Sequence, residues 1–168
     1  MSFVLFAFGE DWIIDGGLYN YEEKNPLRAH LRSHFAHSLS APDNVEPVRR
    51  QKTHGGQNQI INFTSGRDRG HVEMEYKMFP GYLSHRSIEL NRASESITIN
   101  DRINPLQKEI DKSHHITRFL VPSDESVTWE KDKIVVHGSN HRMMIRSNKS
   151  LNRIFIESGQ NFGTYISN

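Results

Sequence analysis

The strongest constraint on the fold is a series of short segments in which apolar and polar residues alternate. The segments at 88–90 (Ile-Glu-Leu) and 97–99 (Ile-Thr-Ile) alternate strictly, as strands do when one face of a sheet meets water. Polar turns separate such segments, which predicts an all-β chain folded as an antiparallel two-sheet β-sandwich. The strand candidates of the longer, C-terminal part are residues 59–63, 71–78, 84–91, 96–101, 114–121, 127–129, 133–137, 142–146, 154–157 and 163–166.

The length of 168 residues fits one domain with its own core, so residues 1–168 are predicted to form a single β-sandwich domain. Around residues 40–58 the composition changes to Pro, Asp, Asn, Arg, Gln and Gly, with few apolar side chains. This stretch is predicted to be a polar loop inside the domain, because the strand pattern resumes directly after it.

Charge and apolar runs exclude several classes of protein. The 21 basic and 20 acidic side chains nearly cancel, so the overall charge gives no support to a nucleic-acid partner. The longest apolar run, residues 3–8, is too short to cross a bilayer and lacks the basic start and cleavage site of a signal peptide. The absence of cysteine excludes disulfides and thiolate metal sites. We therefore expect neither a nucleic-acid partner nor a membrane span.

The N-terminal part of the chain concentrates the side chains that carry chemistry. Two short apolar segments, at 3–8 and 12–15, predict a β-hairpin. Gly16 and Gly17 then supply positive φ angles for a sharp turn, which leaves Asp15 exposed at the end of a strand.

Three spaced histidines, His30, His34 and His37, follow in a segment whose pattern permits two conformations. Asn25 can cap a helix that has Pro26 at its first position, and the three imidazoles would then share one helical face. The same residues fit an extended or irregular segment equally well. The pattern alone leaves both alternatives open.

Asp15, together with one or more of these histidines, predicts a site for a divalent metal. Carboxylate and imidazole groups are ligands that zinc accepts in tetrahedral sites. The alternative is structural, because aspartate commonly caps a turn and histidines are common polar surface residues.

Tyrosines and arginines near the turn suggest a substrate. Tyr19 and Tyr21 carry phenols that can serve in acid–base chemistry, although aromatic residues that cover a sheet edge are more common. Arg28 and Arg32 belong to the most basic stretch of the chain. Guanidinium groups pair with carboxylates and sulfates, so an acidic polysaccharide is the predicted partner. A solvated charged face is the alternative.

The order of these residues resembles the heparinase II/III-like family. Residues 12–21 read Trp-Ile-Ile-Asp-Gly-Gly-Leu-Tyr-Asn-Tyr after an apolar strand, and residues 36–38 read Ala-His-Ser after an arginine-containing stretch. Members of the family carry an apolar strand, a D-x-G-x-Y-x-Y turn, a stretch with arginine and the sequence A-H-N. Further segments that resemble the β-domain of this family are residues 85–90, 97–101 and 119–122.

The resemblance implies a β-sandwich that normally follows an α/α-toroid domain in polysaccharide lyases. Such enzymes cleave uronate-containing acidic polysaccharides by β-elimination, and several bind zinc in the β-domain. Matched by motif, Asp15 and His37 would be the metal ligands, while His30 and His34 would not. The resemblance favours extended chain over helix between Asp15 and His37. It also suggests a periplasmic or secreted bacterial protein.

The resemblance also gives roles to the neighbouring side chains. Arg28 and Arg32 would contact the anionic substrate near the metal, and Tyr19 and Tyr21 would shape the site.

Two departures from the family bear on activity. The family's H-x-H signature, which supplies a further metal ligand and a catalytic histidine, is absent from this sequence, as is the toroid domain; Ser38 also stands where the family has Asn. We therefore expect an N-terminally truncated lyase, inactive without the H-x-H segment and an upstream toroid domain or subunit. The alternative function is a non-catalytic β-sandwich that binds carbohydrate or serves as an interaction module.

Overall fold

The structure is a computed structural model, and it describes residues 2–17, 21–22, 24–43, 45–48, 58–107, 114–122, 126–148, 153–155 and 164–167. The chain divides into two compact units. Unit 1 comprises Met1–Ala41 and His114–Asn168, and unit 2 comprises Pro42–Ser113.

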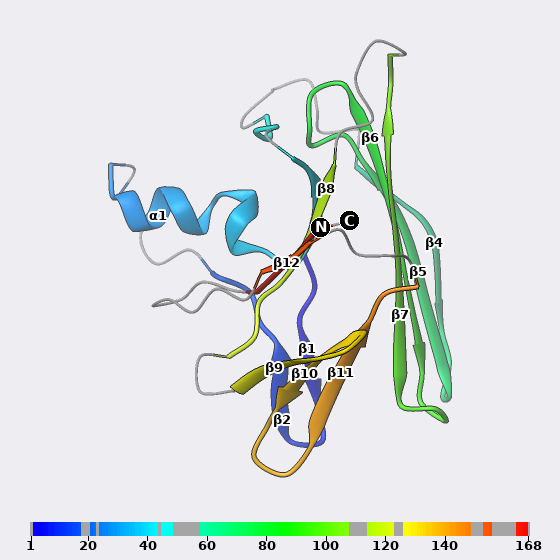
Figure 1. The fold of residues 1–168 in the computed structure, drawn as a ribbon. Helices are drawn as coiled ribbons and strands as arrows, with labels where there is room; N and C mark the ends of the chain where they lie inside the picture. The colour runs from blue at the N-terminus through cyan, green and yellow to red at the C-terminus, as the bar shows by residue number, and fades with distance from the viewer. Residues whose placement is uncertain are drawn as a thin grey trace. The chain divides into compact units, whose positions relative to one another are not determined.

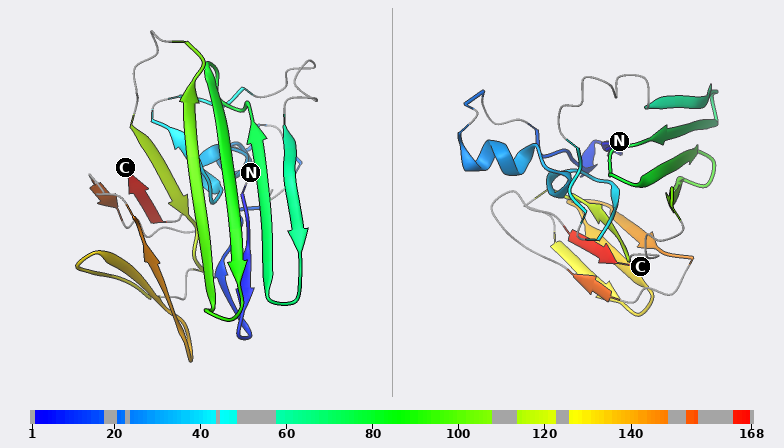
Figure 2. Two further views of the ribbon diagram at one scale, coloured as in Figure 1. Left: turned by 90° about the vertical axis from the view of Figure 1, so that its right-hand side faces the viewer. Right: turned by 90° about the horizontal axis from the view of Figure 1, so that it is seen from above.

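Unit 2 contains one antiparallel sheet whose four strands follow the order of the chain (Figure 2). Short turns join neighbouring strands. In the turn between the third and the fourth strand, Glu95 adopts a positive φ of 48°. Along the last two strands Ile88 lies opposite Ile99 and Leu90 opposite Ile97, so the alternating residues share one apolar face. The strands are β4 (Gln59–Ser65), β5 (Arg69–Tyr76), β6 (Tyr82–Asn91) and β7 (Ser96–Pro105).

A buried ion pair lies on the same face as these apolar residues. Arg86 in β6 is opposite Asp101 in β7, and its Nε and Nη2 each donate a hydrogen bond of 2.7 Å to one carboxylate oxygen of Asp101. The Arg86 side chain is fully buried. Tyr76 is buried as well, and burial raises the pKa of Tyr76 to about 12. Two-point pairing of this kind fixes both distance and orientation.

Unit 1 begins with a β-hairpin formed by β1 (Leu5–Ala7) and β2 (Glu10–Ile13) (Figure 1). Its two-residue turn has positive φ at both positions, 56° at Phe8 and 83° at Gly9, as a type I′ turn requires. The predicted hairpin is therefore confirmed, with its second strand beginning two residues earlier than expected.

A three-stranded antiparallel sheet follows later in unit 1, with β10 between β9 and β11. Lys131, with a φ of 53°, lies in the tight turn between β9 and β10. Ile134 and Val136 project from one face of β10 and are buried. The strands are β9 (Ser126–Glu130), β10 (Lys133–His137) and β11 (Arg142–Arg146).

The remaining strands of unit 1 form a sheet in the order β12-β13-β8-β3. The hydroxyls of Ser40 and Thr117 are 2.7 Å apart and link the neighbouring strands β3 and β8. The strands are β3 (Ser40–Pro42), β8 (His115–Phe119), β12 (Arg153–Phe155) and β13 (Thr164–Ser167).

Two local predictions need correction. Residues 40–42 of the expected 40–58 loop form β3 and are buried, while residues 49–57 of that loop lie outside the described residues. The expected extended chain is interrupted by the helix α1 (Pro26–Leu31) and the 3-10 helix η1 (His34–Ala36).

The residues at the start of α1 explain why this helix forms. The Asn25 side chain accepts hydrogen bonds from the backbone N–H groups of Leu27 and Arg28, and Pro26 holds the first position. These are the strongest start signals that a short helix can carry. The alternative in which three histidines share one helical face is wrong, because α1 ends before His34.

The predicted fold class is confirmed: the chain is an all-β, sandwich-type fold built of several antiparallel sheets. Each of the ten strand candidates after residue 58 corresponds to one strand from β4 to β13. In the part of the chain that the structure describes, neither helix has the length and apolar character needed to cross a membrane.

The ion pair of unit 2 predicts a large mutational effect. We expect Asp101→Asn to lower the free energy of unfolding by about 3–5 kcal/mol, because it leaves the buried Arg86 guanidinium without its counter-charge. Urea denaturation measures the loss. Asp68→Asn, at an exposed aspartate, should change stability by less than about 0.5 kcal/mol, and equal losses in the two variants would contradict the prediction.

Candidate functional site

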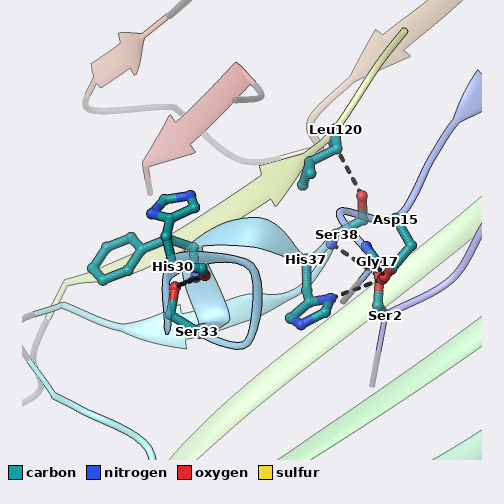
Figure 3. A network of polar contacts seen from close by, with 9 residues as sticks. Ser2, Asp15, Gly17, His30, Ser33, His37, Ser38 and Leu120 are labelled. Atoms are coloured by element: carbon teal, nitrogen blue, oxygen red, sulfur yellow. Dashed lines mark hydrogen bonds and ion pairs between the residues drawn. The ribbon is translucent and has the colours of Figure 1, made fainter. Parts of the chain in front are cut away.

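Asp15 and His37 form a close carboxylate–imidazole pair in unit 1 (Figure 3). His37 Nδ1 lies 2.8 Å from Asp15 Oδ2, and both side chains are partly exposed, at 24% for His37 and 34% for Asp15. The pair therefore combines fixed geometry with access from solvent.

The backbone around Asp15 is held from both sides. The N–H of Ile14 donates to the carbonyl of Leu120 at 2.9 Å, and the N–H of Gly16 donates to the carbonyl of Ala36 at 3.1 Å. These bonds connect the end of β2 with the residue after β8 and with the end of η1. Asp15 is thus placed by residues that lie about 20 and 100 positions away in the sequence.

The two glycines of the turn have different physical roles. A Cβ on Gly16 would lie 2.7 Å from the carbonyl oxygen of Ala36, so this position requires glycine for close approach. Gly17 has open space around it but a φ of 68°, which favours glycine for its conformation. Its N–H donates to Asp15 Oδ1 at 3.0 Å and fixes the carboxylate.

His37 is positioned through the residue that follows it. The Ser38 hydroxyl accepts a 3.0 Å hydrogen bond from the N–H of Leu120, and the N–H of Ser38 donates to the Ser2 hydroxyl at 3.0 Å. Ser2 also hydrogen-bonds to the Asp15 carboxylate. Ser2 and Ser38 therefore tie the two halves of the pair to the same strand end.

The electrostatics of Asp15 favour its charged form. Partial burial raises the pKa of Asp15, but the hydrogen bonds from His37 and from the N–H of Gly17 outweigh burial, and the charge of His37 and a bond to Ser2 add to them. The net pKa of Asp15 lies below the ordinary carboxyl value. An ionised carboxylate is the form that accepts from imidazole or binds a metal.

The structure separates the other two histidines from this pair. His30 is the penultimate residue of α1 and lies apart from Asp15 in Figure 3; burial lowers the pKa of its imidazole. His34 is buried in η1, and its ring lies tilted against that of Phe35, with ring centroids 4.0 Å apart.

The expected substrate contacts lie on or near α1. Arg28 is buried, and its guanidinium carbon lies 5.7 Å from the ring centroid of the exposed Tyr21. Arg32 caps the end of α1 and is half-buried. Tyr19 lies outside the described residues.

The donor atoms present suit a divalent metal only in part. An imidazole nitrogen and a carboxylate oxygen 2.8 Å apart match the ligand types of zinc, whose bonds of about 2.0 Å to each would place two such atoms roughly 3.3 Å apart. Among the described residues no group of three or more histidine, aspartate or glutamate side chains lies close enough to hold a metal ion. The pair can supply two ligands, and a complete site needs others.

The antiparallel sheets and the Asp15–His37 pair belong to an all-β domain that matches a known family. The sequence matches the family model "Heparinase II/III-like, C-terminal" over residues 1–166, and the chain belongs to this family.

Two solved structures share the fold. Crystal structures of heparan sulfate lyase HepC from Pedobacter heparinus, and of a mutant of it, superpose with TM-scores of 0.75 and 0.74 at 16% sequence identity. The match covers 99% of this chain, but the chain spans only 27% of the length of those proteins. The search of curated proteins gave no match.

Sequence reasoning missed Ser2 and Leu120 as parts of the site. Ser2 contacts the backbone of Ser38, and Leu120 contributes only its backbone N–H and carbonyl. A backbone contribution leaves no signature in residue type, so no pattern in the sequence could have identified Leu120.

The close approach at Gly16 predicts a specific substitution effect. Gly16→Ala should lower the free energy of unfolding by roughly 1–3 kcal/mol and displace Asp15 from His37, because the new methyl group would meet backbone atoms of Ala36. Chemical denaturation and the imidazole nitrogen NMR signals of His37 measure the two effects. Gly70→Ala is the matched control, since its Cβ would make only ordinary contacts, and an equal response of both variants would contradict this account.

The lowered pKa of Asp15 predicts a pH dependence. Its charge should stabilise the fold above the ordinary carboxyl pKa of about 3.9, and this contribution should be lost as pH falls through the lower folded-state value. Thermal unfolding of wild type and Asp15→Asn from pH 7 to pH 3 should therefore show a stability gap that shrinks in acid. A gap of constant size would show that the carboxylate charge does not stabilise the fold.

Proposed function

We propose that this chain is the β-domain of a polysaccharide lyase that cleaves uronate-containing acidic polysaccharides by β-elimination. The observation that carries the proposal is the Asp15–His37 pair, which is partly exposed and is held in place by hydrogen bonds at the end of β2. Membership of the heparinase II/III-like family and the shared fold with heparan sulfate lyase HepC support it. Catalysis is proposed to require an H-x-H segment and an α/α-toroid, in the same protein or in a partner subunit.

The reaction needs three events at the scissile linkage. A base removes the proton beside the uronate carboxylate, positive charge neutralises that carboxylate, and an acid protonates the leaving oxygen as the C–O bond breaks. The product carries a new C=C bond in its terminal uronate. We assign none of the three catalytic roles to a described residue, because the pair contains no group placed against a substrate.

Asp15 and His37 are proposed as two ligands of a divalent metal, with zinc as the favoured ion. Bound there, zinc would supply a fixed positive charge, and the remaining ligands would come from outside the described residues. The chain's own contribution is orientation: the N–H of Gly17 holds one carboxylate oxygen, while Ser2 and Ser38 anchor the strand junction behind it. Contacts of this kind orient the ligands of a metal site.

Substrate contact is proposed for the exposed side of α1. Tyr21 is 85% exposed and Arg32 is half-buried, so both can reach a sugar chain in solvent. Arg28 is buried below the ring of Tyr21 and would act by positioning that ring. Tyr19, outside the described residues, keeps its proposed role in shaping the site.

A non-catalytic carbohydrate-binding module is the second candidate. It is favoured by one observation: among the described residues, no third histidine, aspartate or glutamate joins Asp15 and His37 in a group that could hold a metal ion. A domain with this incomplete set would bind a polysaccharide without cleaving it.

Zinc content tests the metal proposal. Wild type dialysed against zinc should retain the ion, while Asp15→Ala and His37→Ala should lose most of it, because each removes one of the two ligands. Elemental analysis measures the content. His30→Ala is the matched histidine control and should behave as wild type; equal zinc in all four proteins would rule out the site.

Activity distinguishes the two candidate functions. The ultraviolet absorbance of unsaturated uronate is followed with heparin, alginate and hyaluronan, using the chain alone and with the α/α-toroid polypeptide from the same genome. A signal only in the presence of the toroid supports the lyase. Binding of the same polysaccharides with no signal in either case supports the module.

A further inference from the structure

One face of the β9–β10–β11 sheet gathers positive charge. In β11, Arg142, Met144 and Arg146 alternate with half-buried residues and are exposed, so they share one face. The register places His137 of β10 opposite Arg142 and Lys133 opposite Arg146 on that same face. We call these four basic residues, Lys133, His137, Arg142 and Arg146, the basic face.

The arrangement is unfavourable for the isolated fold. Side chains directly opposite each other across antiparallel strands interact strongly, and like charges in such positions are destabilising. Lys133 and Arg146 are one such pair. Among the described residues, Glu130, whose carboxylate lies 3.1 Å from the Lys133 ammonium group, offsets part of this charge.

The two arginines are available to a ligand. Among the described residues, neither the Arg142 nor the Arg146 side chain makes a hydrogen bond or an ion pair. Four residues along a strand span about 13–14 Å, so the two guanidinium groups form the ends of a row rather than a single point. The exposed Met144 between them gives the row an apolar centre.

Strand geometry makes such a row suitable for an extended polyanion. The sheet fixes the backbone, so the protein loses little backbone conformational entropy when the arginines bind charges along a polymer. Guanidinium groups bind carboxylate and sulfate groups through paired N–H donors. A ligand of this type would also relieve the repulsion between Lys133 and Arg146.

A nucleic acid fits this face less well. Single-stranded nucleic acids need aromatic side chains on which bases stack, and His137 is the only ring on this face among the described residues. Its Nε2 is already 3.0 Å from the hydroxyl of Thr128. The ring of Trp129 belongs to the opposite face, since Trp129 pairs with Ile134.

We propose that the basic face is an accessory binding surface for sulfated or carboxylated polysaccharide, separate from the Asp15–His37 pair. The inference rests on the proposed function, because it assumes that the protein meets an acidic polysaccharide. The surface holds the polymer and takes no part in bond cleavage.

Binding of a size-defined heparin oligosaccharide, followed by calorimetry on the full chain at several salt concentrations, tests the inference. Arg142→Gln/Arg146→Gln should weaken binding roughly tenfold, since each exposed ion pair contributes up to about fivefold. The salt dependence of the affinity should fall as well, because fewer counterions are released. Arg142→Lys/Arg146→Lys should lose less affinity than the glutamine variant, because it keeps both charges but not the paired N–H donors.

Matched controls locate the surface. Arg67→Gln/Arg69→Gln removes two exposed arginines of unit 2 and should leave binding unchanged. Uncharged dextran should not bind, and oligothymidylate of equal charge should bind more weakly than heparin. Wild-type affinity in Arg142→Gln/Arg146→Gln, or tighter binding of oligothymidylate, would overturn the inference.

A stability measurement shows that the variants fold and tests the repulsion directly. Arg146→Gln should raise the thermal midpoint by about 1–3 °C, because it removes the charge opposite Lys133. A lower midpoint would mean that Arg146 stabilises the sheet, which would overturn the argument.

The two proposals can fail independently. Arg142→Gln/Arg146→Gln should bind zinc as wild type does while its heparin affinity falls; loss of zinc in this variant would mean that the basic face is not separate from the Asp15–His37 pair and would overturn the inference. A further outcome is heparin binding that depends on the two arginines while no unsaturated product forms under any condition. That result would contradict the lyase proposal and support the basic face as a binding surface.

Discussion

The backbone of Leu120 is the point on which the candidate site depends. Its carbonyl accepts from Ile14 at the end of β2, and its N–H donates to the hydroxyl of Ser38 beside His37. The backbone of one residue after β8 therefore links the two segments that carry Asp15 and His37. Because the contact uses main-chain atoms, substitutions of the Leu120 side chain can leave it intact, whereas a change in the path of β8 cannot.

The sequence predicted much of this arrangement because the signals were local. Alternation located β4 to β13, and the start signals at Asn25 and Pro26 pointed to α1, although the family pattern argued for extended chain. The pairing of Asp15 with His37 came from motif order rather than from physics. Ser2 and Leu120 were not predictable, because their contribution depends on contacts between segments far apart in the sequence.

Asp15 and the basic face differ in how their charges are compensated. At Asp15, burial is opposed by donors from His37 and Gly17, so the charge is stabilised where it stands. On the basic face, Lys133 and Arg146 stand opposite each other, and in the described part of the chain Glu130 alone pairs with one of them. The charge of Asp15 is compensated by groups within the fold, whereas the basic face is the surface for which we propose an anionic ligand.

The Arg86–Asp101 pair has a consequence for how unit 2 selects its strand pairing. The rows Ile88–Ile99 and Leu90–Ile97 are nearly interchangeable, so apolar packing alone would accept a shift of β7 by two residues along β6. Such a shift would move the carboxylate about 7 Å from the guanidinium and leave two unpaired charges on a buried face. The ion pair thus selects one register of β6 and β7, whereas the isoleucines and the leucine would pack in either register.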